Sequence, residues 1–314
     1  MDSMFEIKKY TQEDKAVWDA FVKESKNATF LFHRDYMDYH ADRFVDSSLL
    51  LYKNNTLYAL FPANVNGNVV YSHQGLTYGG LLLSTKATLK EVLGIFDQIS
   101  IFYKSDGIEQ IIYKAIPYIY HKYSAQEDLY ALFRNNAQLI CRHASSTIDF
   151  VEPIKFPEQR RAGIRKAIRN DLAISLSEDF TPFWSILTEN LVNRYGKKPV
   201  HNLEEISLLK EKFPQNIKLY LVYHGEEAIA GTVVYEFNHL VHVQYISANS
   251  EGKNLGALDI LFDNLINETY KTFSYFDFGQ STEDNGMVLN EGLIFQKEGF
   301  GGRCVTYDTY KIEL

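Results

Sequence analysis

Apolar positions along the first half of the chain predict a β meander followed by alternating helices and strands. SLLLYK and TLYALFPANV flank a turn at residues 54–55 and predict a β-hairpin, and VVYS follows a second turn at residues 66–67. Apolar residues recur at helical spacing over residues 89–103, and IEQIIYKAI then predicts a strand. A further helix and a strand over residues 139–150 complete this half.

The second half repeats this order of elements. Residues 180–191 place apolar side chains on one helical face, and a shorter helix follows. KLYLVY, AIAGTVVYEF and LVHVQYIS predict three strands in a meander. The segment 256–270 is predicted as a helix, FSYFDFG as a buried strand and VTYDTYKIEL as the last strand. We therefore expect an α/β protein with mixed sheets, in which each half is a strand meander followed by helix, strand, helix and strand.

Chain length and composition indicate two globular domains. A chain of 314 residues is longer than one ordinary domain. Pro153 and Pro157 interrupt the periodicity, so we place one domain at 1–150 and the other at 151–314. A hydrophobic content of 46% excludes a disordered chain, and a net charge of −8 argues against DNA as a partner.

The cysteines and the termini add expectations about location. Cys141 and Cys304 lie far apart without partners at metal-ligand spacing, so we expect two buried thiols in a reducing compartment and no metal. No apolar stretch follows the first charges as in a secretory signal, and no run approaches the ~18 residues that span a bilayer. These patterns predict a cytoplasmic protein without a membrane span.

The segment ANSEGKNLGA offers a candidate ligand site. It is predicted as a loop between strand LVHVQYIS and the helix from residue 256. Such a loop presents unpaired N–H groups and the positive end of a helix dipole, which suits a pyrophosphate. Asn254, Gly256 and Ala257 are the candidate donor-binding residues. An ordinary strand-to-helix connection explains the same residues equally well.

A wider set of segments resembles a known family. The runs RRAGIRKAIRNDL, AGTVVYEF, VHVQYIS, YFDFGQST and NEGLIFQKEGFGGR are similar to the FemAB-related branch of the GNAT acyltransferase superfamily. The resemblance covers residues 151–314 and rests on architecture alone over residues 1–150. It implies two fused GNAT-like domains that transfer acyl or aminoacyl groups to amines during cell-wall or surface-polysaccharide assembly.

The chain also departs from the family pattern. The superfamily's Gln/Arg-x-x-Gly-x-Gly/Ala loop aligns with Glu251, Asn254 and residues 256–257, so two residue types have changed. Glu251 would repel a diphosphate. The long helical hairpin of some aminoacyl-tRNA-dependent members is absent from the sequence, which weakens the tRNA-dependent interpretation.

Basic residues and a histidine are candidates for the acceptor side. Arg161, Arg165 and Arg169 share one face of a predicted helix and could bind phosphates, although a solvated helix face is an equal alternative. His201 follows Arg194 and Tyr195, which are further acceptor-side candidates. Its imidazole could take the proton of an attacking amine, or could instead pack against the next helix.

Strand ends supply the remaining candidates. Gln244 and Tyr245 lie in the strand that holds the donor carbonyl in GNAT enzymes; His242 and Gln244 would share one face, opposite Val243 and Tyr245. Asp277 lies in an apolar strand, so its carboxylate needs a partner or a raised pKa, and it is either a catalytic candidate or the acceptor of a structural hydrogen bond from a loop. The other candidates are Gln280 and Ser281 after that strand, Asn290 at the start of a helix, and Tyr307, which the resemblance implies could protonate a departing thiolate.

These patterns favour an N-acyltransferase that uses acyl-coenzyme A as co-substrate, with no permanently bound cofactor. The acceptor would be an amine on a small-molecule or lipid-linked amino sugar of a cell-envelope or polysaccharide precursor. Two alternatives stay open. One is an aminoacyl-tRNA-dependent transferase of the FemAB type, and the other is a non-catalytic module that binds a sugar or nucleotide.

Overall fold

The chain, described over residues 5–314 by a computed structural model, forms two compact units. The first unit contains the residues up to Ala144 with Thr282–Val288 and Thr306–Leu314, and the second contains Ser145–Ser281 and Leu289–Val305. Strands β9 (Gln138–Asp149) and β17 (Arg303–Glu313) contribute residues to both units. The division into domains at 1–150 and 151–314 stays a prediction. The bounds of the two compact units differ from it, because residues 306–314 belong to the first unit.

The first unit contains most of the short strands. Its helices are α1 (Lys15–Glu24), α2 (Arg34–Met37), α3 (Leu89–Ser105) and α4 (Glu127–Arg134). Its strands besides those shared are β1 (Glu6–Lys9), β2 (Val45–Asp46), β3 (Leu49–Lys53), β4 (Thr56–Phe61), β5 (Asn64–Asn66), β6 (Val69–Tyr71), β7 (Leu82–Leu83) and β8 (Gln110–Lys114). They pair in the orders β1-β3-β4-β7 and β17-β8-β6-β5-β2.

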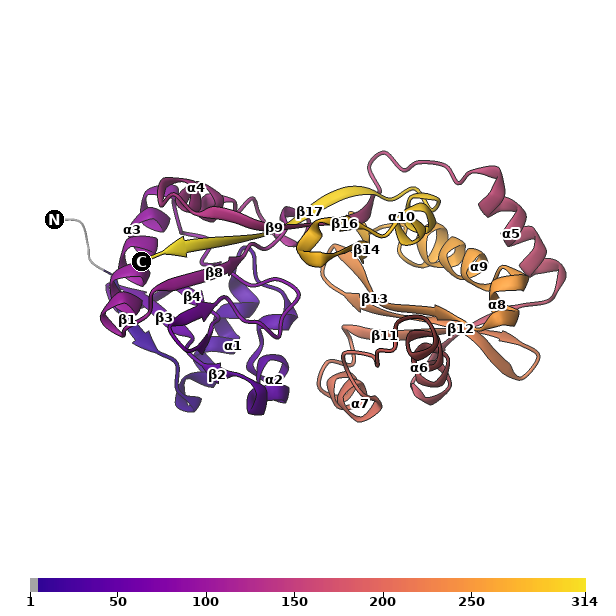
Figure 1. The fold of residues 1–314 in the computed structure, drawn as a ribbon, viewed down its shortest axis with the longest axis horizontal. Helices are drawn as coiled ribbons and strands as arrows, with labels where there is room; N and C mark the ends of the chain where they lie inside the picture. Colours follow the sequence, from indigo (N-terminus) through magenta and orange to yellow (C-terminus); the bar gives the residue numbers. More distant parts are fainter. Residues whose placement is uncertain (1–4) are drawn as a thin grey trace. The chain divides into compact units, whose positions relative to one another are not determined.

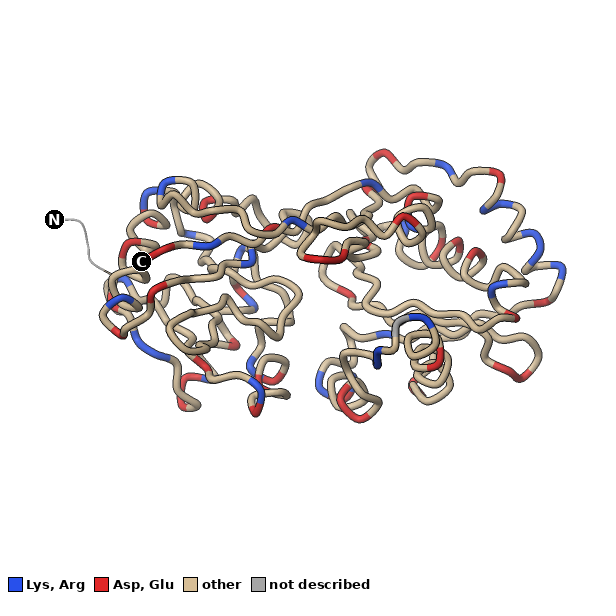
Figure 2. The backbone as a smooth tube through the Cα atoms, viewed as in Figure 1, with Lys and Arg blue, Asp and Glu red and all other residues tan. Residues whose placement is uncertain are grey.

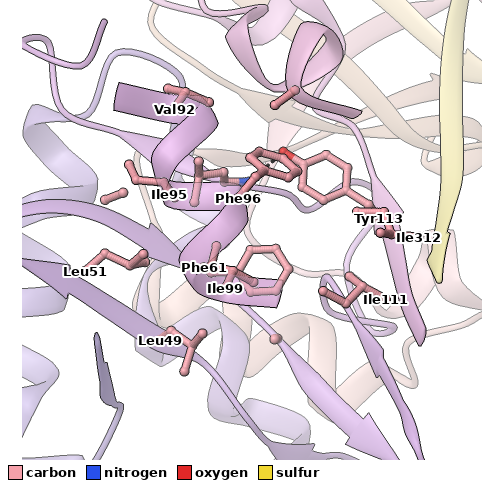
Figure 3. Packing of buried hydrophobic residues seen from close by; sticks show 14 of the residues in the cluster. Leu49, Leu51, Phe61, Val92, Ile95, Phe96, Ile99, Ile111, Tyr113 and Ile312 are labelled. Carbon is pink, nitrogen blue, oxygen red and sulfur yellow. Dashed lines mark hydrogen bonds between the residues drawn. The ribbon is translucent and has the colours of Figure 1, made fainter. Parts of the chain in front are cut away.

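The core of the first unit packs helix α3 against these strands. Apolar side chains of α3, including Ile95 and Ile99, lie against Leu49 of β3 and Ile111 of β8 (Figure 3). Ile312 of β17 belongs to the same cluster, because β17 runs antiparallel to β8. The last strand of the chain is therefore part of this core.

The second unit carries the longer strands. Its helices are α5 (Glu158–Arg169), α6 (Thr181–Tyr195), α7 (Leu203–Lys212), α8 (Ser250–Leu255), α9 (Ala257–Asn264), continued by the π-helical turn Leu265–Thr269, and α10 (Glu291–Glu298). Its strands are β10 (Ala173–Ser177), β11 (Ile217–His224), β12 (Glu227–Glu236), β13 (Leu240–Ala248) and β14 (Tyr275–Gln280). The short strands β15 (Thr282–Glu283) and β16 (Val288–Leu289) pair separately.

A twisted sheet with helices on both faces forms the second unit. The strand order is β10-β11-β12-β13-β14-β9, antiparallel except between β13 and β14. Helices α6 and α7 cover one face, and α5, α8 and α9 cover the other (Figure 1). The meander, the helices and the parallel strand that follows them confirm the predicted α/β class.

Some local features of the second unit differ from the sequence expectations. Strand β10 was not predicted, because it is an edge strand whose largely exposed side chains leave no alternating pattern. The segment 250–255, expected as a loop, is the short helix α8, which starts where the Asn249 side chain accepts a hydrogen bond from Gly252 N.

Candidate active site

The two parallel strands of the second unit part at one residue pair. β13 and β14 pair only through Leu240–Tyr275, Val241–Phe276 and His242–Asp277. Beyond this point β14 bends at Gly279, whose φ is +75°, and Gln280 pairs with Ser145 of β9. β13 continues to Ala248, so within the described residues its second half lacks β14 as a neighbour and its backbone groups on that side can bind a ligand.

A β-bulge sets which face the later side chains of β13 occupy. Val234 of β12 pairs with Val243 and Val233 pairs with Tyr245, so Gln244 is the extra residue. The Tyr245 ring therefore packs against Trp184 of α6, with 5.2 Å between ring centroids, whereas Val243 faces the α9-side core. The prediction that Val243 and Tyr245 share a face was wrong, because a bulge reverses the strand alternation.

A cavity of about 570 Å³ lies at the end of β13. Its lining residues are Leu187, Asn190, Leu191, Asn193, Arg194, Ile246, Ser247, Ala248, Lys253, Leu258, Leu293 and Gln296. Asn190 holds the wall together: its Nδ2 donates to Ser247 Oγ at 2.7 Å and to the Ala248 carbonyl at 2.9 Å. Lys253 Nζ donates to Asn190 Oδ1 at 3.1 Å. Arg194 and Lys253 make this cavity suited to an anionic ligand.

The segment predicted to bind a pyrophosphate, residues 248–257, is packed more tightly against its neighbours than its sequence suggests. The Gly256 N–H donates to the Gly252 carbonyl, and a Cβ at Gly256 would lie 2.6 Å from the carbonyl oxygen of Gly163 in α5. Asn254 is exposed and Ala257 is buried at the start of α9, and of this segment Ala248 and Lys253 line the cavity. Glu251 pairs with His224 instead, with 2.7 Å between Oε1 and Nδ1.

A buried polar cluster lies where the strands part. Asp277 is fully buried, and its Oδ1 accepts hydrogen bonds from Ser145 Oγ at 2.5 Å and Thr147 Oγ1 at 2.8 Å. Its Oδ2 lies 2.7 Å from Nδ1 of His242. Side chains of β9 and of β13 thus supply the partners that Asp277 was predicted to need. Asp277 orients His242 and is enclosed by protein.

Lys297 of α10 is buried beside this cluster. Its Nζ donates to the carbonyls of Gly279 at 2.8 Å and Gln280 at 2.7 Å, which fixes the bend at the end of β14. Burial lowers the pKa of Lys297 to about 8, against an opposing effect of the nearby Asp277 carboxylate. The backbone geometry where β14 bends away therefore depends on a side chain from α10.

A second histidine lies beside Tyr245. His201 is buried, its backbone N–H donates to Tyr245 Oη at 3.2 Å, and its Nδ1 lies 2.5 Å from the same oxygen. Burial raises the pKa of Tyr245 to about 12, so the phenol keeps its proton at neutral pH. The phenol accepts the N–H and donates to Nδ1, which leaves the proton of a neutral His201 ring on Nε2.

Two of the other predicted residues, Asn290 and Tyr307, have structural partners. Asn290 caps α10, its Oδ1 accepting from Leu293 N at 3.1 Å. Ser281 is buried, and no partner of its Oγ lies among the described residues. Tyr307 belongs to the first unit, where its Oη lies 2.7 Å from Tyr120 Oη. The Tyr195 side chain lies outside the described part of the chain.

The predicted arginine face of α5 is exposed and partly paired. Glu158, in the first turn of α5, forms ion pairs with Arg161 at 2.9 Å and with Arg165. Arg169 follows in the last turn of the helix. Figure 2 shows the basic residues along this helix. Arg160, which the sequence did not single out, instead pairs with Asp259 at 2.8 Å and lies over the Phe300 ring.

Both cysteines differ from the expectation of buried thiols. Cys304 is exposed and Cys141 is half-buried. Cys141 Sγ lies 3.3 Å from His143 Nε2, a contact between alternate residues of one strand face that the i, i+2 spacing could have indicated.

Among the described residues no group of three or more His, Cys, Asp or Glu is arranged to hold a metal ion. No described helix has the length and apolarity to cross a membrane.

Comparisons with known proteins bear on this geometry. Residues 158–285 match the family described as "Acetyltransferase (GNAT) domain". No curated protein matches the sequence. The fold is similar to that of FemX, with 10% identity, a TM-score of 0.69, and coverage of 98% of this chain and 97% of FemX. These findings confirm the predicted GNAT-like fold, and the chain shares that fold with FemX along nearly its whole length.

Two further solved structures share the fold along most of their length. L-PGS from Bacillus licheniformis has 12% identity and a TM-score of 0.63, and the match covers 96% of this chain and 91% of that one. A tandem GNAT protein from the clavulanic acid biosynthesis pathway has 8% identity and a TM-score of 0.52, with 98% of each chain covered.

Proposed function

We propose that this chain, which has the tandem GNAT fold of the FemAB-related branch, is an N-acyltransferase that moves an acyl group from a coenzyme A thioester to an amine. The observation that carries the proposal is the parting of β13 from β14 after His242, next to the cavity at the end of β13. An open strand edge can accept the amide-rich arm of a thioester, because its N–H and C=O groups are unpaired.

The charges around the cavity support an anionic donor. Arg194 and Lys253 reach it from α6 and α8. Lys253 is held by Asn190, which also bonds β13, so this cation has a fixed place relative to the strand. If the diphosphate of the coenzyme A thioester bound in the cavity at the end of β13, its thioester group would point along β13 toward His242.

The hydrogen bonds favour His242 over His201 as the general base. Asp277 as a carboxylate can only accept, so Nδ1 of His242 carries the proton and its Nε2 keeps a lone pair. His201 has the opposite tautomer, because Tyr245 donates to its Nδ1. In the proposed step the amine nitrogen attacks the thioester carbonyl, and His242 takes the ammonium proton. The C–S bond then breaks and the thiolate leaves as a thiol after taking up that proton.

Calorimetric titration of the purified full chain with coenzyme A tests the donor. Arg194→Gln should weaken binding by about tenfold, the loss of one charge-assisted contact. Lys198→Gln, a change of similar size at an exposed residue just beyond α6 and outside the cavity lining, should leave binding unchanged. Absence of coenzyme A binding, or an equal effect of both variants, would refute this donor site.

An aminoacyl-tRNA donor is the second candidate, and the observation that favours it is the run of basic residues along α5 (Figure 2). Its ion pairs with Glu158 are exposed and weak, so Arg161 and Arg165 can exchange that carboxylate for phosphates. Binding of deacylated tRNA that falls steeply with salt and is weakened by Arg165→Gln would favour this candidate. The acceptor in either case would be an amine on a cell-envelope or polysaccharide precursor.

A further inference from the structure

We propose that the second unit has a second ligand site, on the α5 and α9 side of its sheet, which binds a single-chain aliphatic carboxylate. The site is a cavity of about 460 Å³. It is lined by Ile148, Phe150, Pro153, Ile154, Lys155, Phe156, Arg161, Ile164, Asp263, Ile266, Asn267, Lys271 and Phe300. None of these residues lines the cavity at the end of β13, so the two sites are separate.

The floor and walls of this cavity are apolar. Ile148, Ile266 and Phe300 are buried members of the second unit's core and form its base. The Phe156 ring packs edge-on against Phe300, with 5.6 Å between centroids. The Arg160 guanidinium lies over the Phe300 ring, with 4.4 Å between Cζ and the ring centroid, and forms an ion pair with Asp259. Arg160 does not line the cavity. Such walls favour methylene groups over a sugar or a nucleotide, which need several polar partners.

The rim carries a positive charge from three separate segments. Lys155 precedes α5, Arg161 lies in its first turn, and Lys271 follows the π-helical turn after α9. Within the described part of the chain Lys155 has no acidic partner. The pairs Arg161–Glu158 and Lys271–Glu268 are exposed, and such pairs contribute little, so a ligand carboxylate can replace either acid.

The lining contains one acidic residue, Asp263, and one oxygen of its carboxylate already accepts a hydrogen bond. Asp263 Oδ1 accepts a hydrogen bond from Asn267 Nδ2 at 2.8 Å. The lining itself carries three cations and one carboxylate above an apolar base, and the exposed Glu158 and Glu268, which lie outside the lining, offset two of these cations until a ligand carboxylate replaces them. This complementarity selects an anionic amphiphile, with its head at the rim and its chain inside.

Calorimetric titration with octanoate, decanoate and dodecanoate, all below their micelle concentrations, tests the site in the full chain. We expect one molecule bound per chain, with affinity rising about fourfold for each added methylene until the cavity is full. Dodecyltrimethylammonium should bind much more weakly than dodecanoate. Absence of stoichiometric binding, or equal affinity for the cationic amphiphile, would overturn the proposal.

Matched variants locate the binding. Lys155→Glu combined with Lys271→Glu should weaken dodecanoate binding by about tenfold or more and leave dodecanol binding unchanged. Lys166→Glu reverses a charge on α5 outside the cavity and should have no effect. Ile164→Trp should fill the cavity and abolish binding of both ligands, with thermal unfolding as the check on folding. Displacement of dodecanoate by coenzyme A, or unchanged binding in the double variant, would place the ligand elsewhere and refute the proposal.

Discussion

Nδ1 of His242 lies 2.7 Å from Oδ2 of Asp277, at the last residue pair that joins β13 to β14. The carboxylate is oriented by the hydroxyls of Ser145 and Thr147 on its other oxygen. If His242 is the base, as proposed, this pair fixes it where the strand edge opens, so acceptor and donor could meet there without movement of the backbone.

Replacement of either member of this pair should lower turnover. Asp277→Asn can place an amide N–H against Nδ1 and so reverse the histidine tautomer, and His242→Gln removes the base. We expect losses on the order of 10² to 10⁴ in kcat with little change in donor affinity. Measured rates with saturating donor and acceptor check this. His201→Gln is the comparison variant. A larger loss of kcat in His201→Gln than in His242→Gln would indicate that His201 is the base.

Tyr245→Phe should affect stability more than catalysis. The phenol both donates to His201 Nδ1 and accepts its N–H, so its removal breaks two hydrogen bonds of a buried histidine. The free energy of unfolding should fall by about 1–3 kcal/mol, which urea denaturation measures. Turnover at 25 °C should stay within about twofold of the wild type if His242 is the base. A large loss of turnover with unchanged stability would contradict both statements.

The first unit should lose stability in acid because of His73. Burial lowers the pKa of this histidine to about 3, with smaller effects of His40, Lys114 and Arg34. The unfolded chain binds this proton near pH 6.5, so the free energy of unfolding falls as pH falls from about 6.5 toward 3. The loss reaches at most about 1.4 kcal/mol per pH unit.

His73→Asn removes this titration and suits the positive φ of +69° at this position. In a Trp184→Phe background Trp18 reports on the first unit alone, since the chain has two tryptophans. We expect the fluorescence-detected unfolding energy of the wild type to fall more steeply between pH 6.5 and 5 than that of the variant. Parallel pH dependences would show that His73 is not the group responsible.

The two cysteines should react at different rates. Cys304 is exposed, whereas Cys141 is half-buried, and burial together with Asp308 raises the pKa of the Cys141 thiol. Ellman's reagent at pH 7.5 should therefore modify Cys304 first. Cys304→Ser and Cys141→Ser each leave a single thiol and assign the two phases. A faster reaction at Cys141 would mean that its contact with His143 activates the thiol.

Local signals in the sequence were sufficient for most of the fold. The hairpin around residues 54–55 is predictable because asparagine tolerates the left-handed backbone, and both residues have φ near +50° to +60°. Helix α6 follows from its apolar spacing. Strand β10 escaped prediction because an exposed edge strand needs no apolar face.

The site could be predicted only in part, because its decisive contacts are distant in sequence. Asp277 was recognisable as a carboxylate in need of partners, but Ser145 and Thr147 reach it only because β9 lies beside β14. The tautomers of His201 and His242 depend on which oxygen each ring meets. The bulge at Gln244 has no sequence signal and yet decides which face Tyr245 occupies.

The return of β17 to the first unit has a consequence for synthesis. Ile312 fills a place in a core whose other strands and helices leave the ribosome much earlier (Figure 3). Until residues 306–314 emerge, the nascent first half exposes the edge of β8 and an incompletely filled core. The N-terminal half therefore stays unfinished while the whole second unit is synthesised, and chaperones can bind at that open edge during this interval.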